Sequence, residues 1–331
     1  MPKTAKRVSR FDNTAKGGTF RISQTDLRIL DLLQDYECLP SIYIPVVLGL
    51  PVEYTLARLS ILRHNAGVIE CPPASWETQN ARYRHAIYAL SQRGEQELQK
   101  AGMFRPGVRG NDHIKHKSAR CITEASFAIG AHETPGVSLV THRKIVEHPS
   151  CPPETKRSAH PFHFAAQFSY RTPPPFNKPI QVDRHFIHDT NPFAIAYTPV
   201  GGQTKRLFVA GIEIDRATEP RNPAKPERRQ TINEKLLGAL ELHRQRTYQQ
   251  QLGIPNAMTL FVTTSEHEMQ NMMALLEERT AGEGSKQIAF KFVREFASLD
   301  HFPKPTGFML TEPWQRVGYP PLDILAELGA K

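Results

Sequence analysis

The first hundred residues alternate between helical and extended patterns of hydrophobic positions. Between 27 and 33 the apolar residues recur at helical spacing, directly after the candidate N-cap residues Ser23 and Thr25. Residues 82–90 instead alternate between polar and apolar side chains, as a strand with one buried face does. The pattern predicts helices over 23–36, 41–48, 51–65 and 91–101, and strands over 68–71 and 82–90.

Three helices, a β-hairpin and a closing helix predict a winged helix-turn-helix over residues 21–102. In that arrangement the third helix enters the major groove of DNA and the hairpin contacts phosphates. The candidate DNA-binding residues are Tyr54, Arg58, Arg63 and His64 on the third helix, and Arg82 and Arg84 on the hairpin. Two alternatives stay open. The same charges could serve merely to solvate the surface of a small α+β domain, and winged helices also bind other proteins.

Residues 113–295 change to a pattern in which strands are separated by helices. The predicted helices cover 113–129, 231–251 and 265–280, and the predicted strands cover 137–142, 180–187, 206–215, 258–263 and 287–292. This order predicts a second domain with an α/β fold. The remaining segments are predicted as a basic disordered arm over 1–20, a linker over 103–112, an irregular insertion over 148–179 and a Pro-rich tail over 296–331.

Carboxylates occur in two of these predicted strands. Glu213 and Asp215 end an apolar run and lie on one face of it, because side chains at i and i+2 project to the same side of a strand. Asp183 lies in the preceding strand. These three acids are candidate ligands for Mg²⁺, which prefers oxygen and keeps several waters. Lys235 on the next helix could supply an amine to a hydrolytic site, or it could pair with the acids in a purely structural network.

The order helix, three strands, helix, strand, with acids on the second and third strands, resembles the PD-(D/E)XK or restriction-endonuclease-like fold. In that family a strand-two aspartate and a strand-three Glu-x-Lys hold Mg²⁺ and activate water. The resemblance implies catalytic roles for Asp183, Glu213 and Lys235. The sequence departs from the pattern at two places, since Val182 stands where proline is expected and Asp215 where lysine is expected.

A second resemblance covers most of the chain. It rests on Asp26–Leu33, Arg58–Leu62 with Ala66-Gly67, Tyr88–Gly94, Ile212–Glu219 and Lys235. Over residues 20–295 these stretches resemble the replication-relaxation family of plasmid and mobile-element proteins. The resemblance implies a winged helix followed by a degenerate nuclease-like domain, with a role in plasmid replication, mobilisation or its control.

Charge and composition narrow the class of protein. The net charge is +9, and residues 1–120 hold 18 Lys and Arg against 11 Asp and Glu, a net of +7. The positive charge is thus concentrated in the predicted DNA-binding part. No apolar run of eighteen residues and no secretory signal occur, and the four cysteines are widely spaced, so we expect a cytoplasmic protein without membrane association. Histidine pairs at i, i+3 spacing lack further ligands, so zinc is not expected.

The sequence therefore predicts a duplex-DNA-binding protein that controls replication, mobilisation or transcription of a mobile element, with an inactive nuclease-like domain. We expect a homodimer that binds a near-palindromic site, and no required cofactor. The main alternative is a Mg²⁺-dependent endonuclease that uses Asp183, Glu213 and Lys235. A third hypothesis is an adaptor that recruits a relaxase or a replication protein.

Overall fold

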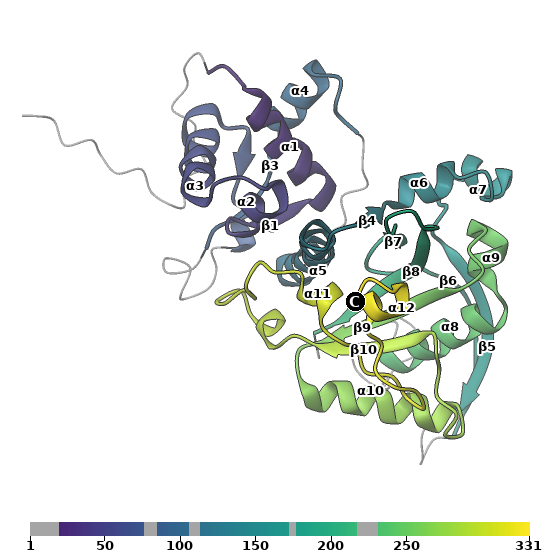
Figure 1. Ribbon diagram of the computed structural model, residues 1–331. Coiled ribbons are helices and arrows are strands. Elements are labelled where there is room, and N and C mark those ends of the chain that lie inside the picture. The colour runs from purple at the N-terminus through teal and green to yellow at the C-terminus, as the bar shows by residue number, and fades with distance from the viewer. Residues whose placement is uncertain (1–19, 76–84, 106–112, 172–176, 217–230) are drawn as a thin grey trace, which may run out of the picture. The chain divides into compact units, whose positions relative to one another are not determined.

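The computed structural model describes residues 20–75, 85–105, 113–171, 177–216 and 231–331. The protein is a mixed α+β structure that divides into two compact units (Figure 1). Unit 1 holds residues 1–129 and 295–306, and unit 2 holds residues 130–294 and 307–331. The division runs through the helix α5 (Ile114–Glu133) and assigns a C-terminal segment to unit 1, whereas the sequence predicted a boundary at 103–112.

Unit 1 begins with three helices and a small antiparallel sheet. Its helices are α1 (Gln24–Tyr36), α2 (Tyr43–Leu48), α3 (Val52–Ile61) and α4 (Gln92–Lys100), with a π-helical turn at Leu62–Ala66. Its strands are β1 (Cys38–Pro40), β2 (Ile69–Glu70) and β3 (Ile87–Leu90), in the order β1-β3-β2. The predicted helices are confirmed within a few residues, except that the third ends as an α-helix at Ile61. The strand β1 was not predicted.

Local sequence explains why α1 begins where it does. The Ser23 hydroxyl accepts a hydrogen bond from the Asp26 amide, and the Asp26 carboxylate accepts one from the Ser23 amide, which together form a capping box. Ile29, Leu30 and Leu33 of α1 are fully buried in the core of unit 1. The Tyr43 hydroxyl also donates a hydrogen bond of 3.0 Å to the Pro303 carbonyl oxygen, which ties the C-terminal segment 295–306 to this core.

Unit 2 contains a five-stranded mixed sheet in the order β10-β9-β8-β7-β4. The strands are β4 (Val137–Val140), β7 (Phe193–Tyr197), β8 (Lys205–Asp215), β9 (Ala257–Thr263) and β10 (Ile288–Phe292). Strands β4, β7 and β8 are antiparallel neighbours, and β9 and β10 continue the sheet parallel to β8. The predictions of β4, β8, β9 and β10 are confirmed, whereas β7 was missed.

The strand that carries Asp183 does not belong to this sheet, which corrects the predicted second core strand. It is β6 (Pro179–Phe186), and it pairs with β5 (Phe164–Arg171) in a separate two-stranded sheet. The region 148–179 is therefore not wholly irregular, since it also contains α7 (Pro153–Arg157). The buried face of the hairpin packs on α8 (Ile232–Arg244). Gly238 permits this packing, because a Cβ there would lie 2.3 Å from the Phe186 ring.

Helices cover both faces of the five-stranded sheet. On one face α8 and α10 (Glu266–Arg279) pack against β9 and β10, with Phe261 and Phe290 stacked at the centre. On the other face the Lys291 ammonium donates hydrogen bonds to the carbonyl oxygens of Phe308 and Glu312, at 2.8 and 3.0 Å. These bonds hold α11 (Phe308–Thr311), which precedes α12 (Ile324–Leu328) near the end of the chain. The predicted weakly patterned tail thus contributes structure to unit 2.

The predicted long helix 231–251 is interrupted. The helix α8 ends at Arg244, Arg246 adopts a left-handed backbone with φ 56°, and α9 (Thr247–Leu252) follows. The break turns Tyr248 back toward the sheet, where its side chain is buried. Other short helices are α6 (His142–Glu147) and the 3-10 turns Pro73–Ser75 and Arg294–Ala297. Across the described ranges, no helix is both long enough and apolar enough to span a bilayer.

Candidate functional site

The strand β8 places Glu213 and Asp215 on one face of the sheet, as their spacing predicts. Both side chains are buried, at 6% and 4% exposure. The parallel register sets Glu213 beside Phe261 and Asp215 beside Thr263 of β9. Both acids thus lie at the carboxyl end of β8, beside the parallel strand β9, and Glu213 faces α8. This edge of a sheet is where open α/β folds commonly bind ligands.

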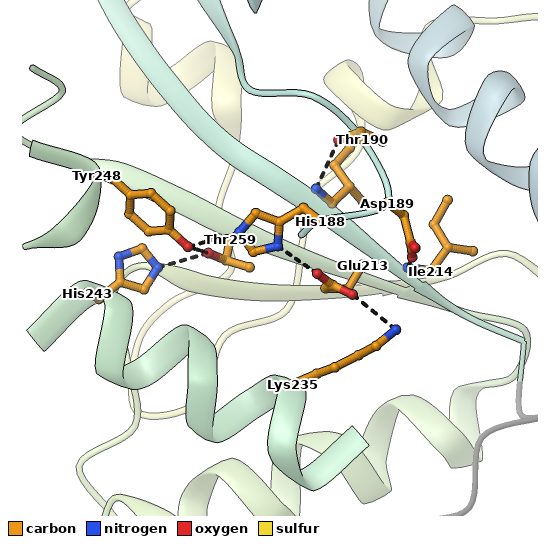
Figure 2. A network of polar contacts seen from close by, with 10 residues as sticks. His188, Asp189, Thr190, Glu213, Ile214, Lys235, His243, Tyr248 and Thr259 are labelled. Carbon is orange, nitrogen blue, oxygen red and sulfur yellow. Dashed lines mark hydrogen bonds and ion pairs between the residues drawn. The ribbon is translucent and has the colours of Figure 1, made fainter. Parts of the chain in front are cut away.

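Lys235 reaches this face from the first turns of α8. The helix begins after Thr231, whose hydroxyl accepts a hydrogen bond of 3.2 Å from the Glu234 amide. The Lys235 ammonium lies 3.1 Å from Glu213 Oε2 in an ion pair that is almost fully buried (Figure 2). The amine that the sequence could only suggest is therefore in direct contact with the central carboxylate.

His188 contacts the other carboxylate oxygen of Glu213. His188 was not among the site residues predicted from the sequence. Its Nδ1 lies 2.6 Å from Glu213 Oε1, and its Nε2 lies 2.9 Å from the Tyr248 hydroxyl (Figure 2). The ring fits because β8 carries glycine at the contact, where a Cβ on Gly211 would come within 2.3 Å of His188. The register of β8 against β9 also shifts between Val209 and Gly211, which marks a bulge at this point.

The network continues away from Glu213 to a second histidine. The Tyr248 hydroxyl lies 3.4 Å from Thr259 Oγ1, which lies 3.0 Å from His243 Nε2. Burial, with a smaller contribution from the nearby His188, lowers the pKa of His243 to about 3, so His243 is neutral. Burial raises the pKa of Tyr248, which therefore keeps its proton. The Glu213 carboxylate can only accept, so the hydrogen bond at 2.6 Å runs from the Nδ1–H of His188 to Glu213.

The residues that follow His188 run beside β8 and bond to its backbone. The Asp189 carboxylate accepts a hydrogen bond of 2.6 Å from the Ile214 amide, and the Thr190 hydroxyl accepts one of 3.0 Å from the Ile212 amide. Asp189 is thus the aspartate next to the Glu213–Asp215 stretch (Figure 2). A sequence signal for it existed, because Asp189 stands in a short polar turn just before the apolar run of β7.

Asp183 is not brought to this network. It is exposed on the β5–β6 hairpin, and its carboxylate accepts a hydrogen bond of 3.0 Å from Gln167. The hairpin instead reaches α8 through other residues. The buried Glu234 carboxylate accepts a hydrogen bond of 3.0 Å from the Tyr170 hydroxyl and lies 3.1 Å from Arg184 Nη2. The candidate site therefore consists of Glu213, Lys235, His188 and the neighbouring acids, without Asp183.

The predicted DNA-binding residues on and just after α3 differ in how far they are exposed. Tyr54 is 52% exposed, and His64 is half-buried. Arg58 forms two hydrogen bonds with Asp26, at 2.6 and 2.5 Å, and Arg63 is buried at 1% exposure. Arg63 was a candidate for DNA contact, but its side chain is inside unit 1. Arg82 and Arg84 lie outside the described residues.

The acids of the site do not form a ready-made cluster of metal ligands. Within the described part of the chain, no three His, Cys, Asp or Glu side chains converge on a point that could hold a metal ion. Two carboxylates on one face of β8 can still serve Mg²⁺, which needs only one or two protein carboxylates. Comparison with known proteins adds nothing further, since no family model, curated protein or solved structure matches this chain.

Proposed function

We propose that the protein binds duplex DNA through unit 1 and controls replication, mobilisation or transcription of a mobile element. The observation that carries this proposal is the arrangement of unit 1. The chain runs through α1, β1, α2 and α3 and then enters the antiparallel pair β2–β3. The strand β1 pairs with the other edge of β3. A winged helix-turn-helix has this order of three helices and a hairpin. The net charge of +7 in residues 1–120 favours a polyanionic partner.

The proposal assigns a nuclease-like fold without cleavage to unit 2. In unit 2 the elements β4, β7, β8, α8 and β9 give the order three antiparallel strands, helix, parallel strand, with α6, α7 and the β5–β6 hairpin inserted after β4, which supports that fold. Both oxygens of Glu213 are engaged, one by Lys235 and one by His188. A carboxylate held in this way stabilises the junction of β8 and α8, which favours a structural role.

A second candidate function is a Mg²⁺-dependent endonuclease, favoured by the contact between Lys235 and Glu213. Nuclease chemistry on this fold needs an amine at the strand-three acid, and the 3.1 Å ion pair provides one. Glu213 and Asp215 would be the carboxylates for the cation, which would polarise a phosphoryl oxygen and lower the pKa of a bound water. Asp189, rather than Asp183, would be the additional acid.

Replacing Arg82 and Arg84 by alanine in the full-length protein is expected to weaken binding to every duplex. Loss of two phosphate contacts lowers the slope of log affinity against log salt concentration by about two. Fluorescence anisotropy over a range of salt concentrations measures this slope, and light scattering on the same samples is expected to show a dimer. The control replaces two exposed cations of unit 2, Lys144 and Arg157. Equal slopes for both variants and the wild type would contradict the role of the wing.

Purified protein is expected to leave supercoiled and linear DNA intact in the presence of Mg²⁺ or Mn²⁺. The physical reason is that Lys235 and His188 already satisfy Glu213, so no described cluster of acids is preorganised for a cation. Gel electrophoresis of plasmid DNA tests this. Metal-dependent nicking that survives in Asp183→Asn but disappears in Lys235→Met would reverse the assignment in favour of the endonuclease.

A further inference from the structure

The exposed face of α3 carries an apolar stripe rather than a row of cations. Tyr54, Ala57 and Ile61 recur at i, i+3 and i+7, so they lie along one face of the helix. Tyr54 is 52% exposed, Ala57 is exposed and Ile61 is half-buried. The exposed Tyr54 and Ala57 are not explained by the core of unit 1, which is built from the opposite face through Thr55, Leu59 and Leu62.

The cations of the same helix are withdrawn from that face. Arg58 donates two hydrogen bonds to Asp26 and lies 4.9 Å from the centre of the Phe20 ring. Asp26 is fully buried, so this pair holds Arg58 against α1. Arg63 is buried in the turn after α3. The side chain that most often identifies guanine, an arginine reaching its O6 and N7, is therefore not offered by this face.

We propose that the stripe formed by Tyr54, Ala57 and Ile61 reads the 5-methyl groups of thymine in the major groove. This inference rests on the proposed DNA-binding function of unit 1. Of the four bases only thymine presents a methyl group there, and apolar side chains are the groups that recognise it. The charge of the region supports DNA as the occupant, because residues 1–120 carry a net charge of +7. Phosphate binding then belongs to cations outside α3, and α3 supplies the sequence preference.

Thymine and uracil differ only by this methyl group, which gives a direct test. Full-length protein is used to recover its preferred duplex from a randomised pool, and affinity is then measured for that duplex with thymine or with uracil throughout. Each methyl group that is buried contributes about a fourfold change in affinity. We expect the uracil duplex to bind about tenfold more weakly or worse, with an unchanged salt slope, because no phosphate contact is altered.

Variants of the stripe identify the residues that read the methyl groups. Tyr54→Ser and Ile61→Ser are expected to reduce the ratio between thymine and uracil affinities toward one, while both retain the thermal unfolding profile of the wild type. The control is Val200→Ser, which changes an apolar residue of unit 2 that is fully exposed. This control is expected to keep the wild-type ratio.

Three results would overturn the inference in different ways. Affinities for the two duplexes within twofold of each other would reject methyl reading and leave DNA binding in place. Failure to recover any duplex, with no measurable binding to DNA, would reject the proposed function itself. Stripe variants that change the mass in light scattering but bind DNA like the wild type would identify the stripe as a contact between protein chains.

Discussion

Asp26→Asn is expected to lower the free energy of unfolding of unit 1 by about 2–4 kcal/mol. Asp26 is fully buried and accepts hydrogen bonds from Arg58 and from both the amide and hydroxyl of Ser23. Breaking a buried ion pair costs about 3–5 kcal/mol. The loss of stability expected here is smaller, because Arg58 keeps 21% of its side chain in water. Hydrogen exchange in increasing urea measures the effect, with α1 and α3 losing protection while β8 and β9 keep it.

The same residue gives unit 1 a defined acid sensitivity. Burial alone raises the pKa of Asp26, but the hydrogen bonds from Arg58 and Ser23 outweigh it and hold the pKa below its usual 3.8. The folded state therefore binds this proton more weakly than the unfolded state. Its contribution to stability is fully present above pH 3.8 and is lost as the pH falls through the lower folded value. Asp26→Asn is expected to remove this part of the acid sensitivity.

Asp31→Asn is the matched control on the same helix. Asp31 lies 2.6 Å from Arg105, but both side chains keep about a third of their surface in water. Such surface pairs contribute between 0 and about 1 kcal/mol. Equal destabilisation by the two variants would show that the burial of Asp26 has no special role.

Glu213→Gln is expected to destabilise unit 2 by about 3–5 kcal/mol. The substitution keeps the size of the side chain but removes the charge that pairs with the buried Lys235 ammonium, and it disrupts the bond from His188. Asp183→Asn is the control, because Asp183 is exposed on the hairpin and should change stability by less than about 0.5 kcal/mol. Hydrogen exchange over β8, β9 and α8 measures both.

A second substitution separates structural from functional reasons for Glu213. Adding Lys235→Met to Glu213→Gln removes the buried ammonium that has lost its ion pair with Glu213, so it is expected to restore part of the lost stability. An increase in stability for Glu213→Gln alone would contradict the structural role. It would instead indicate that the acid is kept at a cost in stability, as functional sites commonly are, and would favour the endonuclease.

The sequence by itself determined the features that depend on neighbouring residues. Ser23 was one of two candidate caps for the first helix, because a Ser or Thr oxygen can bond an amide three residues later, and the structure selects it over Thr25. Glu213 and Asp215 were placed on one face because the period of a strand is two. The apolar runs of β8 and β9 were recognisable because strands buried on both faces are nearly continuous in hydrophobicity.

Only the tertiary structure decided which segments lie together. The strand β6 was predicted to belong to the core sheet, yet it pairs with β5 in a separate hairpin, and the shorter β7 occupies the place beside β8. His188 reaches Glu213 because Gly211 leaves room for its ring, a contact across 25 residues that no local pattern specifies. Arg58 turns inward for a similar reason, since a long side chain can solvate a surface or pair with a buried acid, and only the position of Asp26 in the folded unit selects between them.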